Sequence, residues 1–303
     1  VYFDAAPGIY NEQIRMHRIG GAGPNARVTF RSASGSPGSV TLTYASTAAA
    51  SNYTLQLDSA SYVTYKNITI EATDSTNGRA IDMAHSASYD SIYNCTIIAP
   101  TSGGSTNTSC GLYANLLSGR NNSIIKNNFQ GGSYGMHYQG IAALDPSKDH
   151  VIDSNTFAGM FAYGMYVSFT SRVKVRGNTA LMDAPMANNA YGIYCSNCDS
   201  GYLFKGNKVT IDNSQPGINY YGIYLSQSDS KLSEYGTVAS NQVIAGDVND
   251  GNVYGLYMTT CGYNNVVNNV ARIYTTANTA YGDRKSTRLN SSHSSVSRMP
   301  SSA

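Results

Sequence analysis

The stretch from Tyr191 to Tyr224, YGIYCSNCDSGYLFKGNKVTIDNSQPGINYYGIY, contains one complete period of a two-part motif that recurs along most of the chain. The first part is Tyr-Gly-apolar-Tyr. The second part is an apolar residue followed three positions later by asparagine, as in Phe204 and Asn207. From Gly111 onward the two parts alternate without exception, which is typical of a repeat protein.

Each repeat has the local pattern of a β-strand. In the segment from Gly222 to Leu225, the apolar Ile223 and Leu225 share one face and Tyr224 takes the other, which is the period-2 alternation of a strand. The asparagines recur about every 29 residues, a spacing too variable for a tight helical repeat. Short strands that recur in this way predict an all-β solenoid of stacked coils, about 4.8 Å apart.

Stacking of the coils should place equivalent residues in columns. We expect an inner apolar column, an outer tyrosine column and an Asn ladder at a corner, with Asn67 and Asn94 as its looser members. Asparagine suits a corner because it tolerates the left-handed backbone conformation, and because its amide can donate to one neighbouring coil while accepting from the other.

Several segments resemble a known fold family. The GIY and NN/NT steps, the opening PGIYNEQI and RVTF, and the segment YVTYKNITI are similar to the right-handed parallel β-helix of the pectin-lyase-like superfamily. They most resemble the β-helix segments of large bacterial surface proteins exported by type IX secretion. The resemblance implies an all-β, right-handed parallel β-helix of about eight or more coils over residues 1–282, irregular over 1–60 and regular over 61–282. This superfamily includes lyases, hydrolases, epimerases, adhesins and non-catalytic stalks.

The C-terminal segment 283–303 has a different character. Its beginning, DRKSTRLNSSH, reads as an in-frame translation of a sequencing adapter, so we expect residues 283–303 to be non-native and disordered. Without this segment the formal net charge changes from +2 to −1, and no footprint for nucleic acid remains. No apolar run is long enough to cross a membrane. The native protein is expected to be longer and multidomain.

The strongest surface feature is the predicted outer aromatic column. Stacked rings of this kind either bind the apolar faces of successive sugars or only strengthen the pairing between coils. A second tyrosine column precedes each motif glycine and shares parity with the inner residues, so we assign it to packing. The outer column begins at Tyr113, and its candidate glycan-binding residues are His137, Tyr166, Tyr194, Tyr224 and Tyr257.

Two charged groups are further candidates. Arg172, Lys174 and Arg176, with Lys205 in the next coil, could hold an anionic polysaccharide, although Arg176 could instead pair with Asp153. Asp199 and Asp229 should stack in adjacent coils, where two carboxylates share a proton, bind a cation such as Ca²⁺, or cap turns.

No catalytic residues are assigned from the sequence. The paired-Asp and His-Gly signatures of polygalacturonase-like hydrolases are not recognisable, and His17, His85, His137 and His150 are isolated from any carboxylate motif. We therefore predict a fragment of a secreted or bacterial cell-surface protein that acts as a non-catalytic stalk or glycan-binding adhesin segment, without a cofactor other than Ca²⁺. The alternative is a polysaccharide lyase or glycoside hydrolase acting in a groove along one face.

Overall fold

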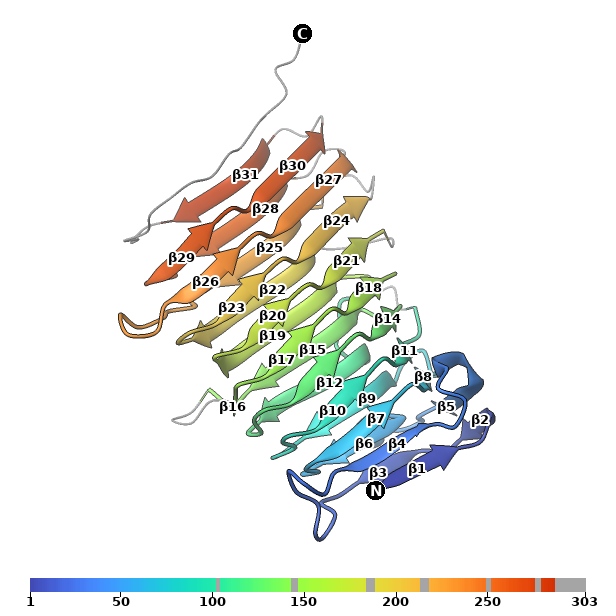
Figure 1. Cartoon of the computed structure of the whole chain (residues 1–303). Coiled ribbons are helices and arrows are strands. Elements are labelled where there is room, and N and C mark those ends of the chain that lie inside the picture. Colours follow the sequence, from blue (N-terminus) through green and yellow to red (C-terminus); the bar gives the residue numbers. More distant parts are fainter. Residues whose placement is uncertain are drawn as a thin grey trace.

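The chain winds into a parallel β-solenoid, in which each coil adds one strand to each of three long sheets (Figure 1). This computed structural model describes residues 1–101, 104–142, 147–183, 189–212, 218–248, 252–275 and 279–286. The predicted all-β, right-handed parallel fold is confirmed. In the described residues, helix is limited to two 3₁₀ turns, η1 (Pro37–Ser39) and η2 (Ala49–Ser51), and no helix there is long and apolar enough to cross a membrane.

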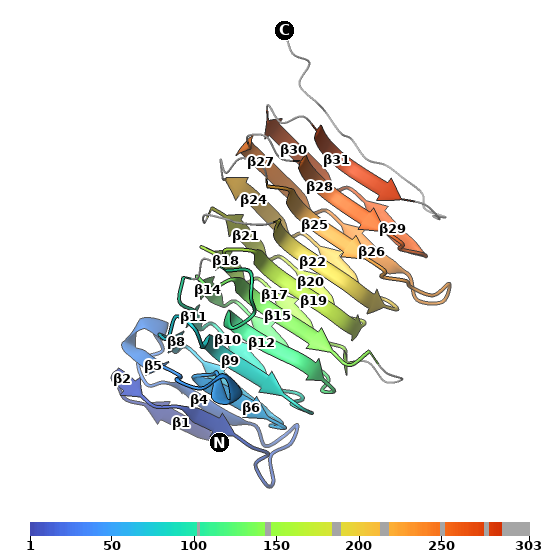
Figure 2. The same ribbon diagram turned by 180° about the vertical axis from the view of Figure 1, so that it is seen from behind.

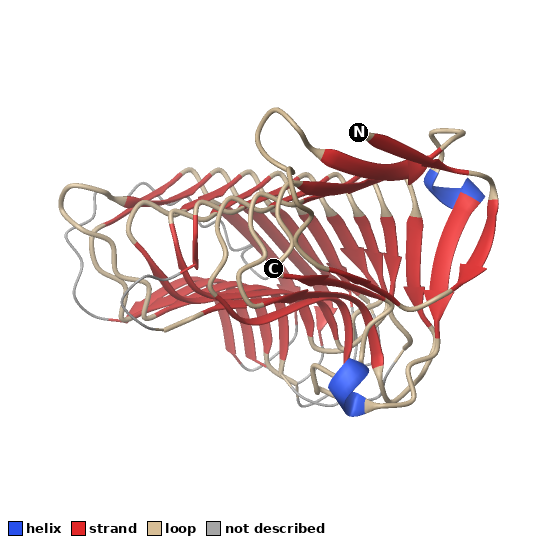
Figure 3. Cartoon of the chain, turned by 90° about the horizontal axis from the view of Figure 1, so that it is seen from below, coloured by secondary structure: helices blue, strands red, loops and turns tan. Residues whose placement is uncertain are grey.

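The three sheets run along the whole array, and the strands of successive coils surround a common interior (Figure 3). Sheet A has ten strands: β1 (Tyr2–Ala5), β4 (Val28–Ser32), β7 (Val63–Lys66), β10 (Ser91–Tyr93), β13 (Ser123–Ile125), β17 (Val151–Asp153), β20 (Lys174–Arg176), β23 (Leu203–Lys205), β26 (Gly236–Ala239) and β29 (Asn264–Val267). Sheet B has ten more: β2 (Gly8–Asn11), β5 (Val40–Tyr44), β8 (Thr69–Ala72), β11 (Thr96–Ile98), β14 (Asn128–Gln130), β18 (Thr156–Ala158), β21 (Thr179–Met182), β24 (Lys208–Asp212), β27 (Gln242–Val248) and β30 (Val270–Thr275).

Sheet C carries the tyrosine motifs and is seen from the other side in Figure 2. Its strands are β3 (Ile14–Met16), β6 (Leu55–Asp58), β9 (Gly78–Ala84), β12 (Ser109–Leu117), β15 (Tyr134–Gly140), β19 (Tyr163–Ser171), β22 (Ala190–Asp199), β25 (Tyr220–Ser226), β28 (Asn252–Thr259) and β31 (Thr279–Ser286). A short extra strand, β16 (Ser147–Lys148), pairs with β19.

The core consists of columns of apolar side chains inside the coils. In sheet A, Ile92, Ile124, Ile152, Val175 and Phe204 lie at equivalent positions and are all buried. Their burial follows from the alternation along each strand, since neighbouring residues of a strand point to opposite sides and the middle residue here points into the coil.

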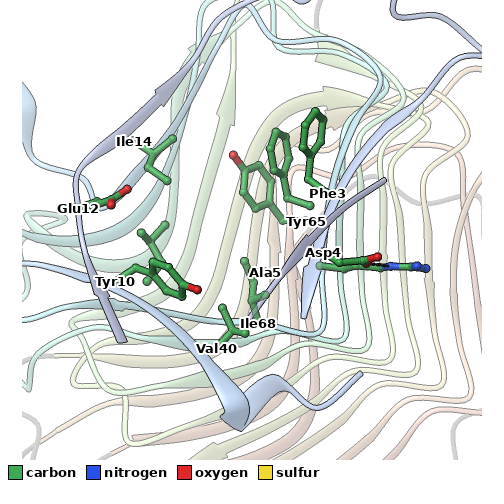
Figure 4. Close-up of a pocket in the computed structure, with 12 residues that line it drawn as sticks. Phe3, Asp4, Ala5, Tyr10, Glu12, Ile14, Val40, Tyr65 and Ile68 are labelled. Atoms are coloured by element: carbon green, nitrogen blue, oxygen red, sulfur yellow. Dashed lines mark hydrogen bonds and ion pairs between the residues drawn. The ribbon is translucent and has the colours of Figure 1, made fainter. Parts of the chain in front are cut away.

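At the N-terminal end the apolar interior is open. A cavity of about 200 Å³ lies there, and Phe3, Tyr10 and Tyr65 are among the residues that line it (Figure 4). The rings of Phe3, Phe30 and Tyr65 stack in succession, with centroids 5.0 and 5.1 Å apart. The cavity is therefore the end of the same aromatic and aliphatic core.

A buried row of asparagines marks the corner between sheets A and B. From Asn127 to Asn241, each side-chain Nδ2 donates to the Oδ1 of the asparagine in the next coil, over distances of 2.8–3.0 Å. The same Nδ2 also donates to a backbone carbonyl, such as Ile152 O from Asn178. The amides of the row are thus hydrogen-bonded without water. The members are Asn127, Asn155, Asn178, Asn207, Asn241 and Asn269.

The left-handed backbone conformation expected for the ladder asparagines is found one residue earlier in the chain. The residues with positive φ directly precede the buried asparagines, as at Lys126 (58°) and Ser154 (56°). Asn67 and Asn94 also have positive φ, and Asn94 Nδ2 donates to Asn67 Oδ1 over 2.8 Å. These two asparagines therefore belong to the preceding, less buried column, which corrects their assignment to the ladder itself.

A second buried polar row lies at the corner between sheets C and A. The backbone N–H of Asp90 donates to Asn122 Oδ1 (3.0 Å), and that of Asn122 donates to His150 Nδ1 (3.2 Å). Because His150 Nδ1 accepts, the imidazole is neutral, and burial lowers its pKa to about 3. The buried Tyr138 hydroxyl, 3.0 Å from the same Nδ1, completes the row.

The C-terminal strand β31 extends past the predicted boundary at residue 282. Asp283, Arg284, Lys285 and Ser286 continue the parallel pairing with β28, in contrast to the disorder expected for this segment. Parallel pairing uses backbone groups, so it places little demand on side-chain identity at an array end. The rest of the predicted tail, residues 287–303, lies outside the described residues.

Candidate functional site

The predicted outer aromatic column lies on the outer face of sheet C, in the expected alignment. Tyr166 pairs with Tyr194, and Tyr194 with Tyr224, across successive coils, while the flanking apolar residues point inward. The rings from Tyr113 through His137 and Tyr166 to Tyr194 are nearly parallel, with centroids 4.7–5.1 Å apart. The interplanar angle then changes to 84° between Tyr194 and Tyr224 and to 41° between Tyr224 and Tyr257.

The second tyrosine column, which we assigned to core packing, lies on the same outer face. Its rings stack on one another 4.5–5.2 Å apart. They contact the first column edge to face in the earlier coils, as between Tyr163 and Tyr166 at 5.7 Å and 86°, and at a smaller angle of 21° between Tyr221 and Tyr224. The packing assignment is therefore wrong. The column consists of Tyr134, Tyr163, Tyr191, Tyr221, Tyr254 and Tyr281.

The motif glycine explains why the parity argument failed. A Cβ on Gly135 would lie 2.6 Å from both a Phe157 ring carbon and the Gly164 carbonyl oxygen, so this glycine faces the interior. The next residue, Met136, is also fully buried. Two consecutive inward positions interrupt the alternation, and the tyrosine before the glycine is thereby turned outward, as at a β-bulge.

Polar side chains border the two tyrosine columns. On one side, Asn219 Nδ2 donates to Asn189 Oδ1 (3.0 Å), and Asn252 Nδ2 donates to Asn219 Oδ1 (2.8 Å). On the other side, Ser196, Ser226 and Thr259 occupy equivalent positions two residues after the first-column tyrosines. Sequence reasoning missed the asparagine border, although each of these asparagines stands two residues before a Tyr-Gly pair.

We call the two tyrosine columns with His137 the aromatic face. In the second column, and from Tyr113 to Tyr194 in the first, parallel stacking covers the ring faces with neighbouring rings, so the partly exposed tyrosines there present mainly ring edges and hydroxyls. Burial raises the pKa of Tyr191 and Tyr194 to about 12, so both phenols remain hydrogen-bond donors over the physiological pH range. Burial also lowers the pKa of His137 to about 4, which keeps that ring uncharged.

The predicted basic group lies elsewhere, on sheet A and its corner. Arg176 Nε donates to Asp153 Oδ2 over 2.5 Å, which is the ion pair that the sequence offered as the alternative. Arg172 binds Asp149 through two contacts of 2.7 and 2.8 Å. Lys174 and Lys205 are exposed on neighbouring strands. Two of the four cations are therefore already paired with carboxylates.

Asp199 and Asp229 occupy adjacent coils and are exposed. Asp199 Oδ1 accepts the backbone N–H of Asp229 (3.3 Å), and Asp229 Oδ1 accepts that of Gly262 (2.6 Å). Each carboxylate thus caps the next coil, which is the turn-capping alternative. The described part of the chain contains no cluster of three or more His, Cys, Asp or Glu side chains that could hold a metal ion, and the Ca²⁺ contact stays a prediction.

The solenoid is similar to several solved structures. One is the GH136 lacto-N-biosidase from Eubacterium ramulus, with a TM-score of 0.51 and 11% identity over 92% of this chain and 62% of that chain. Another is PfbA, a surface adhesin of Streptococcus pneumoniae, with a TM-score of 0.46 and 13% identity over 92% and 84% of the two chains. A third is DFA-IIIase from Arthrobacter chlorophenolicus A6, with a TM-score of 0.45 and 9% identity over 91% and 77%.

These likenesses concern the fold, since the identities are low, and the chain spans less than two thirds of the lacto-N-biosidase. No curated protein matches the sequence. A family model described as the right handed beta helix region matches residues 111–291, which is more than half of the chain and includes every coil with a complete Tyr-Gly motif. The protein belongs to this right-handed β-helix family.

Proposed function

We propose that this chain is a glycan-binding segment of a secreted or cell-surface protein, and that the aromatic face of sheet C is the binding surface. The observation that carries the proposal is the repeated cross-section of this face. In successive coils an asparagine, two tyrosines and a serine or threonine lie side by side, as in Asn219, Tyr221, Tyr224 and Ser226.

This composition suits a polymer rich in hydroxyl groups. Phenols donate and accept hydrogen bonds, and amide and hydroxyl side chains do the same, so a sugar chain can exchange hydrogen bonds along several coils. Ring edges supply apolar contact at a small cost in side-chain entropy, because stacking already holds the rings. The tyrosines and the neutral His137 carry no charge, so we expect a neutral glycan.

The test separates binding from stability by removing hydroxyl groups while keeping the rings. A double variant, Tyr194→Phe with Tyr224→Phe, retains stacking but loses two donors. If each hydroxyl contributes one hydrogen bond to the glycan, affinity should fall by about 2 kcal/mol, or roughly 30-fold in Kd. Retention on insoluble cellulose, chitin and starch, together with a glycan array of neutral and acidic oligosaccharides, provides the measurement.

A matched control exists on another surface. Tyr62 and Tyr89 also form a stacked, partly exposed pair, with centroids 4.7 Å apart, but they lie outside sheet C. The variant Tyr62→Phe with Tyr89→Phe should bind like the unchanged protein. Equal losses in both double variants, or no binding of the unchanged protein to any glycan at millimolar concentration, would contradict the proposal and favour a stalk.

A further inference from the structure

Towards the N-terminus the aromatic columns give way to a cluster of titratable side chains on the same face. The first column continues from Tyr113 to Asp82, then to Gln56 and Arg15 in the preceding coils. Asp58, two residues beyond Gln56, lies beside this row at the end of β6. His17 and His85, which the sequence suggested were isolated from carboxylates, both contact Asp58. That suggestion was wrong for these two histidines.

Asp58 is the centre of the cluster and is only 6% exposed. Arg15 donates to its Oδ2 from Nε (3.0 Å) and from Nη2 (2.5 Å), and His85 Nδ1 lies 2.6 Å from its Oδ1. Burial opposes the ionisation of Asp58, but the hydrogen bonds from Arg15 and His85 outweigh it and hold the pKa of this carboxyl below its usual range. Asp58 is therefore a carboxylate with both oxygens occupied.

His85 combines a fixed orientation with access to solvent. Its side chain is 71% exposed, and its Nδ1 points to the Asp58 carboxylate. A carboxylate at this distance accepts a proton from Nδ1–H, so the lone pair of a neutral ring lies on Nε2, the nitrogen away from Asp58. An imidazole held by a buried carboxylate through one nitrogen, with the second nitrogen turned away from that carboxylate, is the arrangement of a general base.

The remaining groups favour one class of reaction. Glycoside hydrolysis commonly uses two carboxyl groups, one of them ionised as nucleophile or base. Both oxygens of Asp58 are already bound by Arg15 and His85, and the other carboxyl of this row, Asp82, accepts a hydrogen bond from Gln56 Nε2 (2.9 Å) while burial raises its pKa. Attack of water on a carbonyl carbon is instead assisted by a base together with a hydrogen-bond donor or a cation near the developing oxyanion. The Arg15 side chain is 50% exposed and uses Nε and Nη2 for Asp58, which leaves Nη1 to donate.

We propose that His85, oriented by Asp58 and assisted by Arg15, is a general-base site for the hydrolysis of O-acyl esters. His85 Nε2 takes a proton from water as the water oxygen bonds to the ester carbonyl carbon, and Arg15 stabilises the resulting oxyanion. The bond from that carbon to the alkoxy oxygen then breaks, and the imidazolium returns its proton to the leaving oxygen. Ester and water become acid and alcohol, without redox change.

The test uses the full chain and p-nitrophenyl acetate, because release of p-nitrophenol reports ester cleavage directly. His85→Gln should lower the second-order rate constant for p-nitrophenol release at least ~10-fold. His17→Gln is the matched control. The His17 side chain is 64% exposed, but its Nδ1 lies 3.3 Å from Asp58 Oδ2, a longer contact than that of His85. Because this contact is longer, the loss of rate in His17→Gln should be clearly smaller than the loss in His85→Gln.

Thermal melting of both variants checks that each is folded, and exposure of both rings predicts unchanged melting temperatures. Equal rates for His85→Gln and the unchanged protein would overturn the proposal, as would equal losses in the two histidine variants. Cleavage of p-nitrophenyl β-glycosides in place of the acetate would also overturn it, in favour of glycoside hydrolysis. These rates do not depend on the aromatic face, so failure of glycan binding would leave this result unaffected.

Discussion

The Oδ1 atom of Asn207 accepts two hydrogen bonds from Asn178, one from its backbone N–H (3.1 Å) and one from its side-chain amide (3.0 Å). Asn207 in turn donates through Nδ2 to Val175 O and to Asn241 Oδ1, both at 2.9 Å. A single side chain thus satisfies backbone and amide groups in the coils on both sides. Its truncation would leave several buried polar groups without partners.

We expect Asn207→Ala to reduce the free energy of unfolding by about 1–3 kcal/mol, the cost of leaving buried hydrogen-bonding groups unpaired. Asn265→Ala is the control, because Asn265 is exposed on β29, and it should change stability by less than about 0.5 kcal/mol. Chemical denaturation of both variants measures the difference. Similar values for the two asparagines would mean that the buried row contributes no more than a surface residue.

The second prediction concerns Asp90, which is 1% exposed and whose Oδ2 has no hydrogen-bond partner within the described residues. Burial raises its pKa to about 7, although the hydrogen bond from Val63 N–H opposes this shift. The unfolded carboxyl titrates near pH ~4, so between about pH 4 and 7 the folded chain retains a proton that the unfolded chain has released. The contribution of Asp90 to stability should therefore fall as pH rises through this window.

Asp90→Asn should flatten this part of the pH profile and stabilise the protein at pH 8, by an amount on the order of 1–3 kcal/mol. Asn122→Asp, in the adjacent coil, should have the opposite effect at pH 8, because it adds a second buried carboxyl. Denaturation midpoints between pH 4 and 8 provide the measurement. An Asp90→Asn protein whose stability still falls by the same amount between pH 4 and 7 would show that Asp90 is ionised throughout.

The third prediction separates the structural contribution of the tyrosine columns from binding. The Tyr194 ring contacts Tyr166, Tyr191 and Tyr224 with centroids 5.1–5.3 Å apart. Tyr194→Ala should therefore lower the free energy of unfolding by about 2–4 kcal/mol through lost ring contacts and burial, whereas Tyr194→Phe should stay within about 1 kcal/mol.

Tyr235→Ala is the comparison for Tyr194→Ala. Tyr235 is 41% exposed, and its ring contact with Tyr263 is longer, at 6.4 Å. We expect a loss below about 1 kcal/mol. If Tyr194→Ala lowers the free energy of unfolding by no more than Tyr235→Ala does, the tyrosine columns do not stabilise the stacking of the coils.

The repeats allowed much of the fold to be predicted from the sequence. The alignment of Tyr194 with Tyr224, and of Phe204 with Val238, follows from counting along the motif, because neighbouring coils repeat the same strand pattern. The same counting failed for Tyr191, since a strict period of two cannot anticipate the two consecutive inward positions that begin at the motif glycine.

The Asp58 cluster could not be predicted in this way. Its members come from coils that precede the first Tyr-Gly pair at Tyr134, and the interval from Arg15 to Asp58 differs from that between Asp58 and His85. Only the pairing of β3 with β6 and of β6 with β9 shows that the three side chains meet. The ion pair between Arg172 and Asp149 could not be predicted either. Both residues lie at a corner with positive φ, where the alternation of a strand does not apply.

The motif glycines also restrict how such a protein can change in evolution. A Cβ on Gly164, Gly192 or Gly222 would come within 2.5–2.7 Å of the carbonyl oxygen of the equivalent glycine in the next coil. A larger residue at one of these positions would force two neighbouring coils apart, and no change within that coil alone could restore their contact. Gain or loss of length is therefore tolerated most easily as duplication or deletion of a whole coil, which carries its own glycine, tyrosine pair and corner asparagine with it.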